Sequence, residues 1–327
     1  MTIKEIAQMA GVSSAAVSRY LNGGSLSQQK RDVIRDVIQR TGYRPDAAAQ
    51  MLRSKVTDYT GVIVPKINSD AVSRVTAGIT QVLSQRGYLC LLANTSGEPE
   101  QELAYLELFQ DRSVAGIILM ATVLPPRHQE MLKACTVPLV VAGQQCEGVP
   151  CVYHDDYNAA RELTGRLIQR GRRKLVYIGV TEQDIAVGLH RKQGMRAALT
   201  EAGLSPDIPC AVSNFTADGG RRAMEELLQA HPDLDGVMCS TDLIAIGAME
   251  ALRAAGKELP RDVSVAGIDD SWAGAHITPR LTTAHFYYEE CGAEAARMLL
   301  SMVDQKDGDL PVRQTMMGYT VVERDSI

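Results

Sequence analysis

The N-terminal residues repeat apolar and polar positions with the period of an α-helix. Residues 3–10 place apolar side chains at i, i+3, i+4 and i+7, which forms one stripe along a helix. Thr2 and Glu5 have the spacing of a capping box at the start of that helix. Gly11 permits a tight turn after it. The pattern therefore predicts a short helix, a tight turn and the start of a second helix.

The second predicted helix has one polar face. Ser13 can cap its start, and Val17 and Leu21 would point inward. The opposite face holds small and polar side chains with one arginine: Ser14, Ala15, Ser18, Arg19 and Asn22. Short side chains allow close approach to base edges in the DNA major groove, and an arginine can bind a guanine through two hydrogen bonds. An ordinary helical hairpin with a solvated polar face would show the same pattern.

A third helix is predicted from Ser27 to Thr41, with Gly42 as its left-handed C-cap. Its apolar positions are Val33, Ile34, Val37 and Ile38. Residues 45–53 form a further helical stretch, which Pro45 can begin. Isolated helices need about 12 residues to be stable in water, so this stretch should fold only against a partner.

Beyond Thr60 short apolar runs alternate with amphipathic stretches. The strand candidates are GVIVP, YLCLLAN, AGIILMA, PLVVAG, KLVYIGV, DGVMCST and VSVAGID. The helical candidates lie near 70–86, 98–112, 157–171, 189–203, 218–230 and 242–255. Continuous apolar runs between helices predict parallel strands that are buried on both faces. Because six or more such units exceed one comfortable sheet, we expect an α/β body of two doubly wound lobes, with a ligand crevice at the carboxyl ends of the strands.

The charge is divided unevenly along the chain. Residues 1–58 contain nine Lys/Arg and five Asp/Glu, a net charge of +4, whereas all 327 residues sum to −5, which leaves −9 for the rest. A basic head on an acidic body is expected to contact DNA at one end. The candidates for phosphate or base contacts are Arg19, Lys30, Arg31, Arg44, Arg53 and Lys55.

Several classes of protein are disfavoured by what the sequence lacks. No apolar run reaches the roughly 18 residues of a membrane span, and the N-terminus lacks the apolar core of a secretion signal, so we expect a cytoplasmic protein. The seven cysteines include no CxxC pair, so neither a disulfide framework nor a metal site is expected. No GxSxG, P-loop, HExxH or strand-borne GxGxxG is present, and the histidines share no common spacing. We therefore expect no enzyme and no cofactor.

Three segments, AGVSSAAVSRYLNGG, GYRPDAAAQMLR and GVIVP, resemble the lactose/galactose repressor family of bacterial transcription factors. The resemblance covers essentially the whole chain. It implies a helix-turn-helix DNA-binding head at residues 1–45, a hinge helix and linker at 46–58, and an effector-binding and dimerisation domain at 59–327. In that family the second helix reads the major groove. The hinge helix orders on operator DNA, where the leucine that matches Leu52 wedges into the minor groove. Ala16 and Asp46 depart from the frequent threonine and asparagine of the family.

The resemblance also places the two lobes, which are arranged as in periplasmic sugar-binding proteins. Lobe N would comprise about 59–157 and 287–317, and lobe C about 158–286 and 318–327. A polyhydroxyl ligand needs bidentate donors, carboxylate acceptors and an aromatic face. The positions that match the family's effector contacts, or face the crevice by analogy, are Lys66, Asn68, Arg191, Phe215, Thr241, Asp269 and Tyr288. Tyr288 is equally readable as a core tyrosine, Asp242 is expected to cap a helix, and Lys66 with Arg191 would suit a phosphorylated sugar.

The resemblance implies a sequence-specific repressor of a carbohydrate-utilisation operon that a small sugar releases from its operator. Purine-binding relatives have aromatic residues where this chain has Ala71 and Val72, which favours a sugar. A purine- or nucleoside-responsive regulator, a regulator that depends on a co-repressor, and a sugar-binding protein without a regulatory role stay open. No leucine heptads follow the last predicted strand, so a homodimer on a pseudo-palindromic double-stranded operator is expected.

Overall fold

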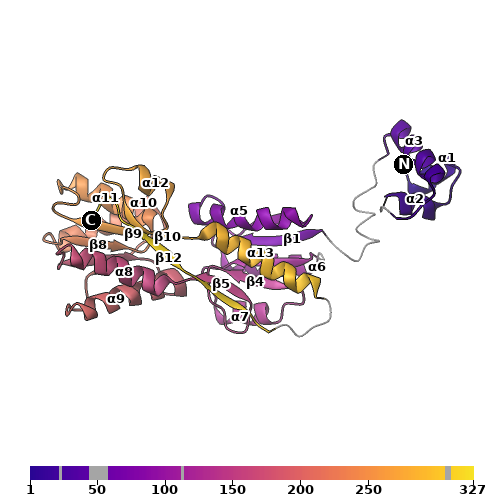
Figure 1. Ribbon diagram of the computed structural model, residues 1–327. Coiled ribbons are helices and arrows are strands. Elements are labelled where there is room, and N and C mark those ends of the chain that lie inside the picture. The colour runs from indigo at the N-terminus through magenta and orange to yellow at the C-terminus, as the bar shows by residue number, and fades with distance from the viewer. Residues whose placement is uncertain (22–23, 44–57, 112–113, 306–310) are drawn as a thin grey trace. The chain divides into compact units, whose positions relative to one another are not determined.

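Three helices make up the described part of the N-terminal unit, Met1–Thr57, of the computed structural model. They are α1 (Ile3–Met9), α2 (Ser14–Leu21) and α3 (Gln28–Thr41), and Figure 1 labels all three. The structure describes residues 1–21, 24–43, 58–111, 114–305 and 311–327. The predicted capping box is present, since the Glu5 amide donates to Thr2 Oγ1 at 3.3 Å and the Thr2 amide donates to Glu5 Oε2 at 2.9 Å.

The head has its own small hydrophobic core. Ile6, Val17, Ile34 and Val37 are almost fully buried in it, together with three alanines. Val33, at the position before Ile34, is instead 41% exposed. This core holds the three helices together, because α1 and α2, with seven and eight residues, are shorter than the roughly 12 residues that an isolated helix needs, and the 14 residues of α3 barely exceed that length.

Two six-stranded sheets build the second unit, Asp58–Ile327. In spatial order the first sheet contains β11 (Gln314–Met317), β5 (Cys151–His154), β4 (Leu139–Ala142), β3 (Gly116–Met120), β1 (Tyr59–Val64) and β2 (Leu89–Asn94). The second contains β12 (Tyr319–Val322), β10 (Thr282–Phe286), β9 (Ser264–Ile268), β8 (Gly236–Cys239), β6 (Leu175–Gly179) and β7 (Cys210–Val212). All neighbouring strands are parallel except β10 and β12. The predicted α/β class with two doubly wound sheets is confirmed; we call the first sheet with its helices lobe N and the second lobe C.

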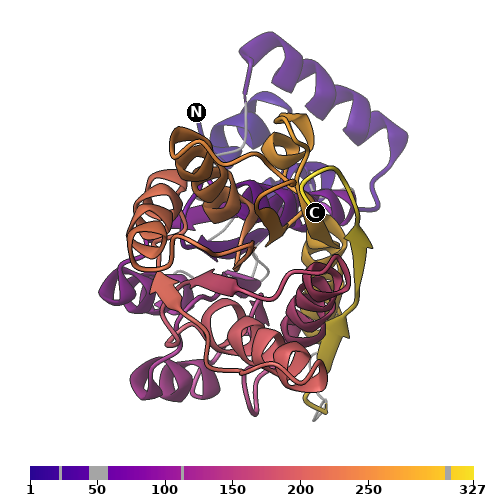
Figure 2. The same ribbon diagram turned by 90° about the vertical axis from the view of Figure 1, so that its left-hand side faces the viewer.

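Helices cover both sheets. Lobe N has α5 (Asp70–Gln85), α6 (Pro99–Asp111), α7 (Pro126–Lys133) and α13 (Tyr288–Asp304). Lobe C has α8 (Asp156–Gln169), a π-helix η1 (Ile185–His190), α9 (Arg191–Glu201), α10 (Ala217–Ala230), α11 (Asp242–Ala254) and α12 (Trp272–His276). Figure 2 views lobe C from its far end and shows helices on both faces of its sheet. None of the described helices is long and apolar enough to cross a membrane.

Helices α5 and α13 lie side by side in lobe N (Figure 1) because glycines let their backbones approach. A Cβ atom added at Gly78 would lie 1.9 Å from the Glu289 carbonyl oxygen, and one at Gly292 would lie 2.0 Å from the Val75 carbonyl oxygen. Real Cβ atoms do not come so close, so only glycine fits at either position. The close contact fixes the start of α13 against the first turns of α5.

The chain passes between the two sheets three times, after β5, after β10 and after β11. Lobe N therefore receives α13 and β11 from the C-terminal part of the sequence. One hydrophobic cluster contains residues of both lobes, among them Val62 and Phe286. The two lobes thus share part of their core.

Strand β2 differs from its prediction as a strand buried on both faces. Leu89, Leu91 and Leu92 are 58%, 38% and 49% exposed. The strand lies at the edge of its sheet, paired only with β1 among the described strands, so one side of its backbone has no neighbour. An apolar, exposed edge is a surface that other chains can cover.

Candidate functional site

Arg191 is a buried charge held by two carboxylates. It is the first residue of α9, and its side chain is 3% exposed. Its Nε donates to Asp156 Oδ1 at 2.6 Å, and its Nη1 lies 3.8 Å from Asp269 Oδ1 and donates to the Ser240 carbonyl. Burial alone would lower the pKa of Arg191, but Asp156, Tyr288 and Asp269 hold it above its usual range. The guanidinium is therefore charged, and two carboxylates balance its charge, as burial of an ion requires.

Asp269 directly follows strand β9 and faces the same cluster. Its Oδ1 accepts a hydrogen bond of 2.6 Å from the hydroxyl of Tyr288, which is buried at the start of α13. Burial raises the pKa of Asp269 to about 6, although Arg191 and the Tyr288 hydroxyl oppose that shift. Arg191 also lies over the ring of Phe286, 5.1 Å from its centroid. The structure thus brings Arg191, Asp269 and Tyr288 together in one buried cluster.

Three polar atoms in this neighbourhood have no hydrogen-bond partner among the described residues. They are His154 Nε2, Tyr177 OH and Ser240 Oγ, and all three residues are buried. The His154 ring stacks on Phe286 with the ring centroids 4.6 Å apart. Burial and then Arg191 lower the pKa of His154 to about 3, so its imidazole is neutral. Buried polar atoms usually have partners, so these three are free to bond to a polar ligand.

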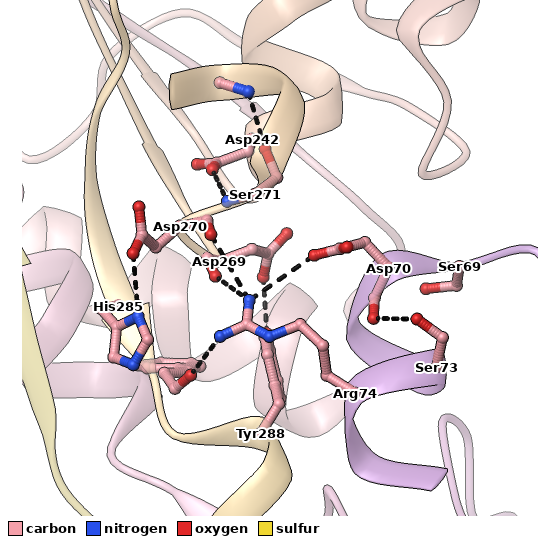
Figure 3. Close-up of polar contacts among 12 residues, drawn as sticks. Ser69, Asp70, Ser73, Arg74, Asp242, Asp269, Asp270, Ser271, His285 and Tyr288 are labelled. Atoms are coloured by element: carbon pink, nitrogen blue, oxygen red, sulfur yellow. Dashed lines mark hydrogen bonds and ion pairs between the residues drawn. The ribbon is translucent and has the colours of Figure 1, made fainter. Parts of the chain in front are cut away.

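Asp242 and Asp270 support the turn that follows β9. Asp242 accepts from the Ser271 amide at 2.7 Å and from the Thr283 hydroxyl at 2.6 Å. Burial, and after it the charge of Asp269, raise the pKa of Asp242 to about 7. Asp270 is paired with Arg324 and with His285. Figure 3 shows the two aspartates of the turn, Asp269 and Asp270, between Asp242 and the first helix of lobe N.

The lobes also meet through Gln144, which follows β4 in lobe N. Its Nε2 donates to Asp184 Oδ1 at 2.6 Å, and its Oε1 accepts from the Ala186 amide at 3.1 Å. Asp184 and Ala186 belong to the start of η1, the π-helix that leads into Arg191. Lobe N therefore contacts the start of the π-helix that directly precedes Arg191.

The remaining predicted effector residues have other surroundings. Thr241 is 7% exposed and caps α11, because its hydroxyl accepts from the Ile244 amide at 3.3 Å. The expectation that Asp242 makes this cap is wrong, since its carboxylate turns to Ser271 and Thr283. Phe215 has a φ of 63° and packs against the core of lobe C. Lys66 and Asn68 are exposed between β1 and α5.

In the head the structure exposes most of the predicted polar face. Ser14, Ala15 and Arg19 are exposed on α2, and Ser18 is half-buried. Ser13 accepts from the Ala16 amide at 3.3 Å and so caps α2. Lys30 is exposed, and Arg31 donates to the Gly24 carbonyl at 2.8 Å. The predictions for Asn22, Arg44, Leu52, Arg53 and Lys55 lie outside the described residues.

Both the head and the two-lobed unit match known protein families. Residues 2–46 match the bacterial regulatory proteins of the lacI family, and residues 164–327 match a periplasmic binding protein-like domain. The sucrose operon repressor of Staphylococcus xylosus is 33% identical over 304 residues, which cover 93% of this chain and 94% of that protein. The chain belongs to the LacI family. This LacI-family member is accordingly a transcriptional regulator and not an enzyme.

Solved structures of LacI-family proteins share its fold. The transcriptional regulator CelR in complex with cellobiose is 30% identical and superposes with a TM-score of 0.76, covering 100% of this chain and 99% of that one. The Lac repressor bound to ONPG in the repressed state is 21% identical and has a TM-score of 0.90, covering 100% and 99% of the two chains. The second likeness shows the fold alone.

The unfolding free energy of this LacI-family regulator should fall as the pH rises between the ordinary pKa of Asp242 and its pKa in the folded chain. Asp242 has a pKa of about 7 in the folded chain, whereas the ordinary pKa of an aspartate is 3.8, so its carboxyl group binds a proton more tightly when the chain is folded. The free-energy cost of burying the ionised carboxylate is therefore absent below about pH 4 and complete above about pH 7. It amounts to roughly 1.4 kcal/mol for each unit of pKa difference. Asp242→Asn should exceed the wild type in unfolding free energy by a margin that is small at about pH 4 and grows until about pH 7, which urea denaturation at about pH 4 and at about pH 8 measures.

Asp233→Asn is the control of opposite sign. Asp233 pairs with Lys174 at 2.7 Å on the surface, and that bond lowers its pKa. Its stabilising contribution is present above its unfolded pKa, so the asparagine variant should gain nothing at pH 8. An Asp242→Asn variant that is no more stable than the wild type at pH 8 would contradict the raised pKa.

Proposed function

We propose that this regulator represses a carbohydrate-utilisation operon and that a neutral sugar, bound between the lobes, releases it from operator DNA. The observation that carries the proposal is the cluster around Arg191, in which a paired guanidinium, the Asp269 carboxylate and three unpartnered buried polar atoms lie beside aromatic rings. A sugar presents hydroxyl groups to such donors and acceptors, and its C–H faces pack against aromatic rings. The relatives named for sucrose and cellobiose support the same class of effector.

The charge of the cluster favours a neutral sugar over a phosphorylated one. The Arg191 charge is already balanced by Asp156, and Asp269 and Asp242 add further buried carboxylates. Lys66 is exposed, and no hydrogen bond or ion pair joins it to Arg191 among the described residues. A phosphate group at this cluster would meet carboxylates without a free cation, and burying an unpaired charge is costly.

The head would bind DNA through α2, whose exposed face of Ser14, Ala15 and Arg19 is small enough to enter the major groove. A pseudo-palindromic operator requires two heads, and we propose a homodimer. The exposed leucines of edge strand β2 support a second copy as the partner that covers them. Leu52 and the hinge segment around it would then meet their counterparts in the minor groove.

Release follows from linkage between the two sites. If closure of the lobes on sugar disfavours the arrangement of heads that fits the operator, sugar weakens DNA binding, and DNA must weaken sugar binding by the same factor. Sugar titrations with and without operator duplex measure one factor, and duplex titrations with and without sugar measure the other. A factor of one in both would exclude coupling between the two sites.

The test begins with selection of duplexes from a randomised pool by the full-length protein. The selected duplex is then challenged with sucrose, cellobiose, ribose, glucose 6-phosphate and guanine. We expect a pseudo-palindrome that one of the neutral sugars displaces. Displacement by glucose 6-phosphate or guanine alone would overturn the neutral sugar, and a pool without any enriched palindrome would overturn the repressor.

A further inference from the structure

Arg74 joins lobe N to the backbone of lobe C. It lies on α5, and its guanidinium reaches the ends of two strands of the other lobe, as Figure 3 shows. Its Nη1 donates to the carbonyl oxygens of Asp269 at 3.0 Å and Asp270 at 3.4 Å, and its Nη2 donates to that of Phe286 at 3.2 Å. Asp70, one turn earlier on α5, lies 3.5 Å from the same guanidinium and balances its charge.

Two of the three carbonyls that Arg74 binds, those of Asp269 and Asp270, belong to a turn with unusual backbone angles. Asp269 has a φ of 140° and Asp270 a φ of 51°, and neither is glycine. Side-chain-bearing residues rarely adopt such angles, so the turn persists only where its neighbours hold it. Within lobe C, Arg324 and His285 hold the Asp270 carboxylate. The two carbonyl groups are held from lobe N by Arg74.

A second contact leads from Arg74 to the carboxylate of Asp269. The guanidinium lies over the ring of Tyr288, 5.2 Å from its centroid. The hydroxyl of the same tyrosine donates to Asp269 Oδ1. Arg74 therefore constrains Asp269 at its backbone directly and at its side chain through Tyr288.

We propose that Arg74 is a positioning residue through which lobe N sets the direction of the Asp269 carboxylate, so that effector binding and lobe closure are one equilibrium. The role of Asp269 as an effector ligand rests on the function proposed above. The Arg74 contacts exist only while lobe N lies against lobe C. When the lobes part, the turn loses the donors to its two carbonyls, and the Asp269 carboxylate loses its fixed direction. Arginine suits this role because its planar fork presents donors to several carbonyls at once, whereas a lysine offers one nitrogen.

Amide hydrogen exchange of the full-length protein, without sugar or DNA, tests the positioning directly. The amides of Asp269, Asp270 and Ser271 are all hydrogen-bonded, so a loosened turn exposes them. Arg74→Met should accelerate exchange in residues 269–273 about tenfold, although the substitution lies in the other lobe. Arg86→Met is the control on the same helix, because Arg86 pairs at 2.7 Å with Asp304 inside lobe N. Equal exchange at 269–273 in Arg74→Met and the wild type would overturn the proposal.

Arg74→Lys is a second variant for the case in which Arg74→Met accelerates amide hydrogen exchange throughout lobe N and so loosens the whole lobe. Lysine retains the positive charge beside Asp70 but has one nitrogen, so it cannot reproduce the two nitrogens of Arg74, of which Nη1 donates to Asp269 and Asp270 and Nη2 to Phe286. We expect accelerated exchange confined to residues 269–273, of smaller size than for methionine. Wild-type exchange in the lysine variant would show that the guanidinium fork is not what holds the turn.

Sugar affinity supplies the functional readout. With whichever of sucrose, cellobiose or ribose displaces the operator, Arg74→Met should raise the dissociation constant about tenfold or more, Arg74→Lys less, and Arg86→Met not at all. The chain's single tryptophan, Trp272, follows the turn directly and is 73% exposed, so its fluorescence can follow the titration. If Arg74→Met accelerates amide exchange but none of the three sugars binds the protein, the neutral-sugar effector is refuted and the positioning role of Arg74 is retained. Equal sugar affinity in Arg74→Met and the wild type would refute the coupling to the effector.

Discussion

Replacing Arg191 with methionine should lower the unfolding free energy of the two-lobed unit by about 3–5 kcal/mol and abolish sugar binding. The substitution leaves Asp156 and Asp269 buried without the cation that now lies 2.6 Å and 3.8 Å from them. A lone buried charge costs more than the pair contributes, so most of the loss comes from the stranded carboxylates. Urea denaturation measures the stability, and calorimetry measures the sugar affinity.

Two further variants separate charge from packing. Arg191→Met combined with Asp156→Asn should regain part of the stability, because the amide removes one unpaired charge, while sugar binding stays lost. Arg196→Met removes another arginine of α9, whose partner Asp207 is 79% exposed, and should cost less than about 1 kcal/mol. A single Arg191→Met variant as stable as Arg196→Met would show that the buried ion pair does not form.

Replacing Ile34 with alanine should abolish operator binding and leave sugar affinity unchanged. Ile34 is 0% exposed in the core of the head, and deleting so much of a buried side chain costs about 2–5 kcal/mol. A unit of Met1–Thr57 has little stability to lose, because small domains bury a small share of their surface. The head should therefore unfold while the second unit stays folded. Scanning calorimetry should show one transition lost, and operator affinity should fall by at least about 100-fold.

Val33→Ala is the matched control, since the neighbouring residue on α3 is 41% exposed. It should change operator affinity less than about twofold. Loss of sugar binding in Ile34→Ala would show that the two units do not fold independently.

The head was the part of the fold that the sequence predicted best. Its helix ends depend on local chemistry, namely the capping box at Thr2, the cap at Ser13 and the left-handed Gly42. Local signals of this kind are contained in three or four consecutive residues. The order of the long buried strands was equally readable, because each is a continuous apolar run between helices.

The elements that the sequence did not predict have weaker local signals. Strands β7, β10, β11 and β12 are short or rich in threonine, and their strand conformation depends on the neighbour they pair with. Sheet pairing across the chain is not encoded in a short window, so tertiary context decides such segments. Helix α13 is different: its buried small and apolar positions follow a helical period, so its sequence carried a readable signal.

The candidate site divides in the same way. Arg191, Asp269 and Tyr288 could be nominated because each follows a recognisable motif. Asp156 and Arg74 could not, since their importance lies in contacts with residues far away in the sequence. The one available signal for Asp156 was a pair of acids directly after the buried strand β5. The effector roles of Lys66, Asn68, Phe215 and Thr241 stay predictions.

The triple passage between the sheets sets the order in which a growing chain can complete its lobes. When residues up to Phe286 have been synthesised, β6, β7, β8, β9 and β10 of lobe C are all available, but lobe N still lacks α13 and β11. The face of α5 that contains Gly78 stays uncovered until α13 has been synthesised. The last strands, β11 and β12, then close one sheet each within a few residues of one another. A premature stop codon before Gln314 therefore removes one strand from each of the two sheets, whereas a stop codon directly after Met317 removes only β12 from lobe C.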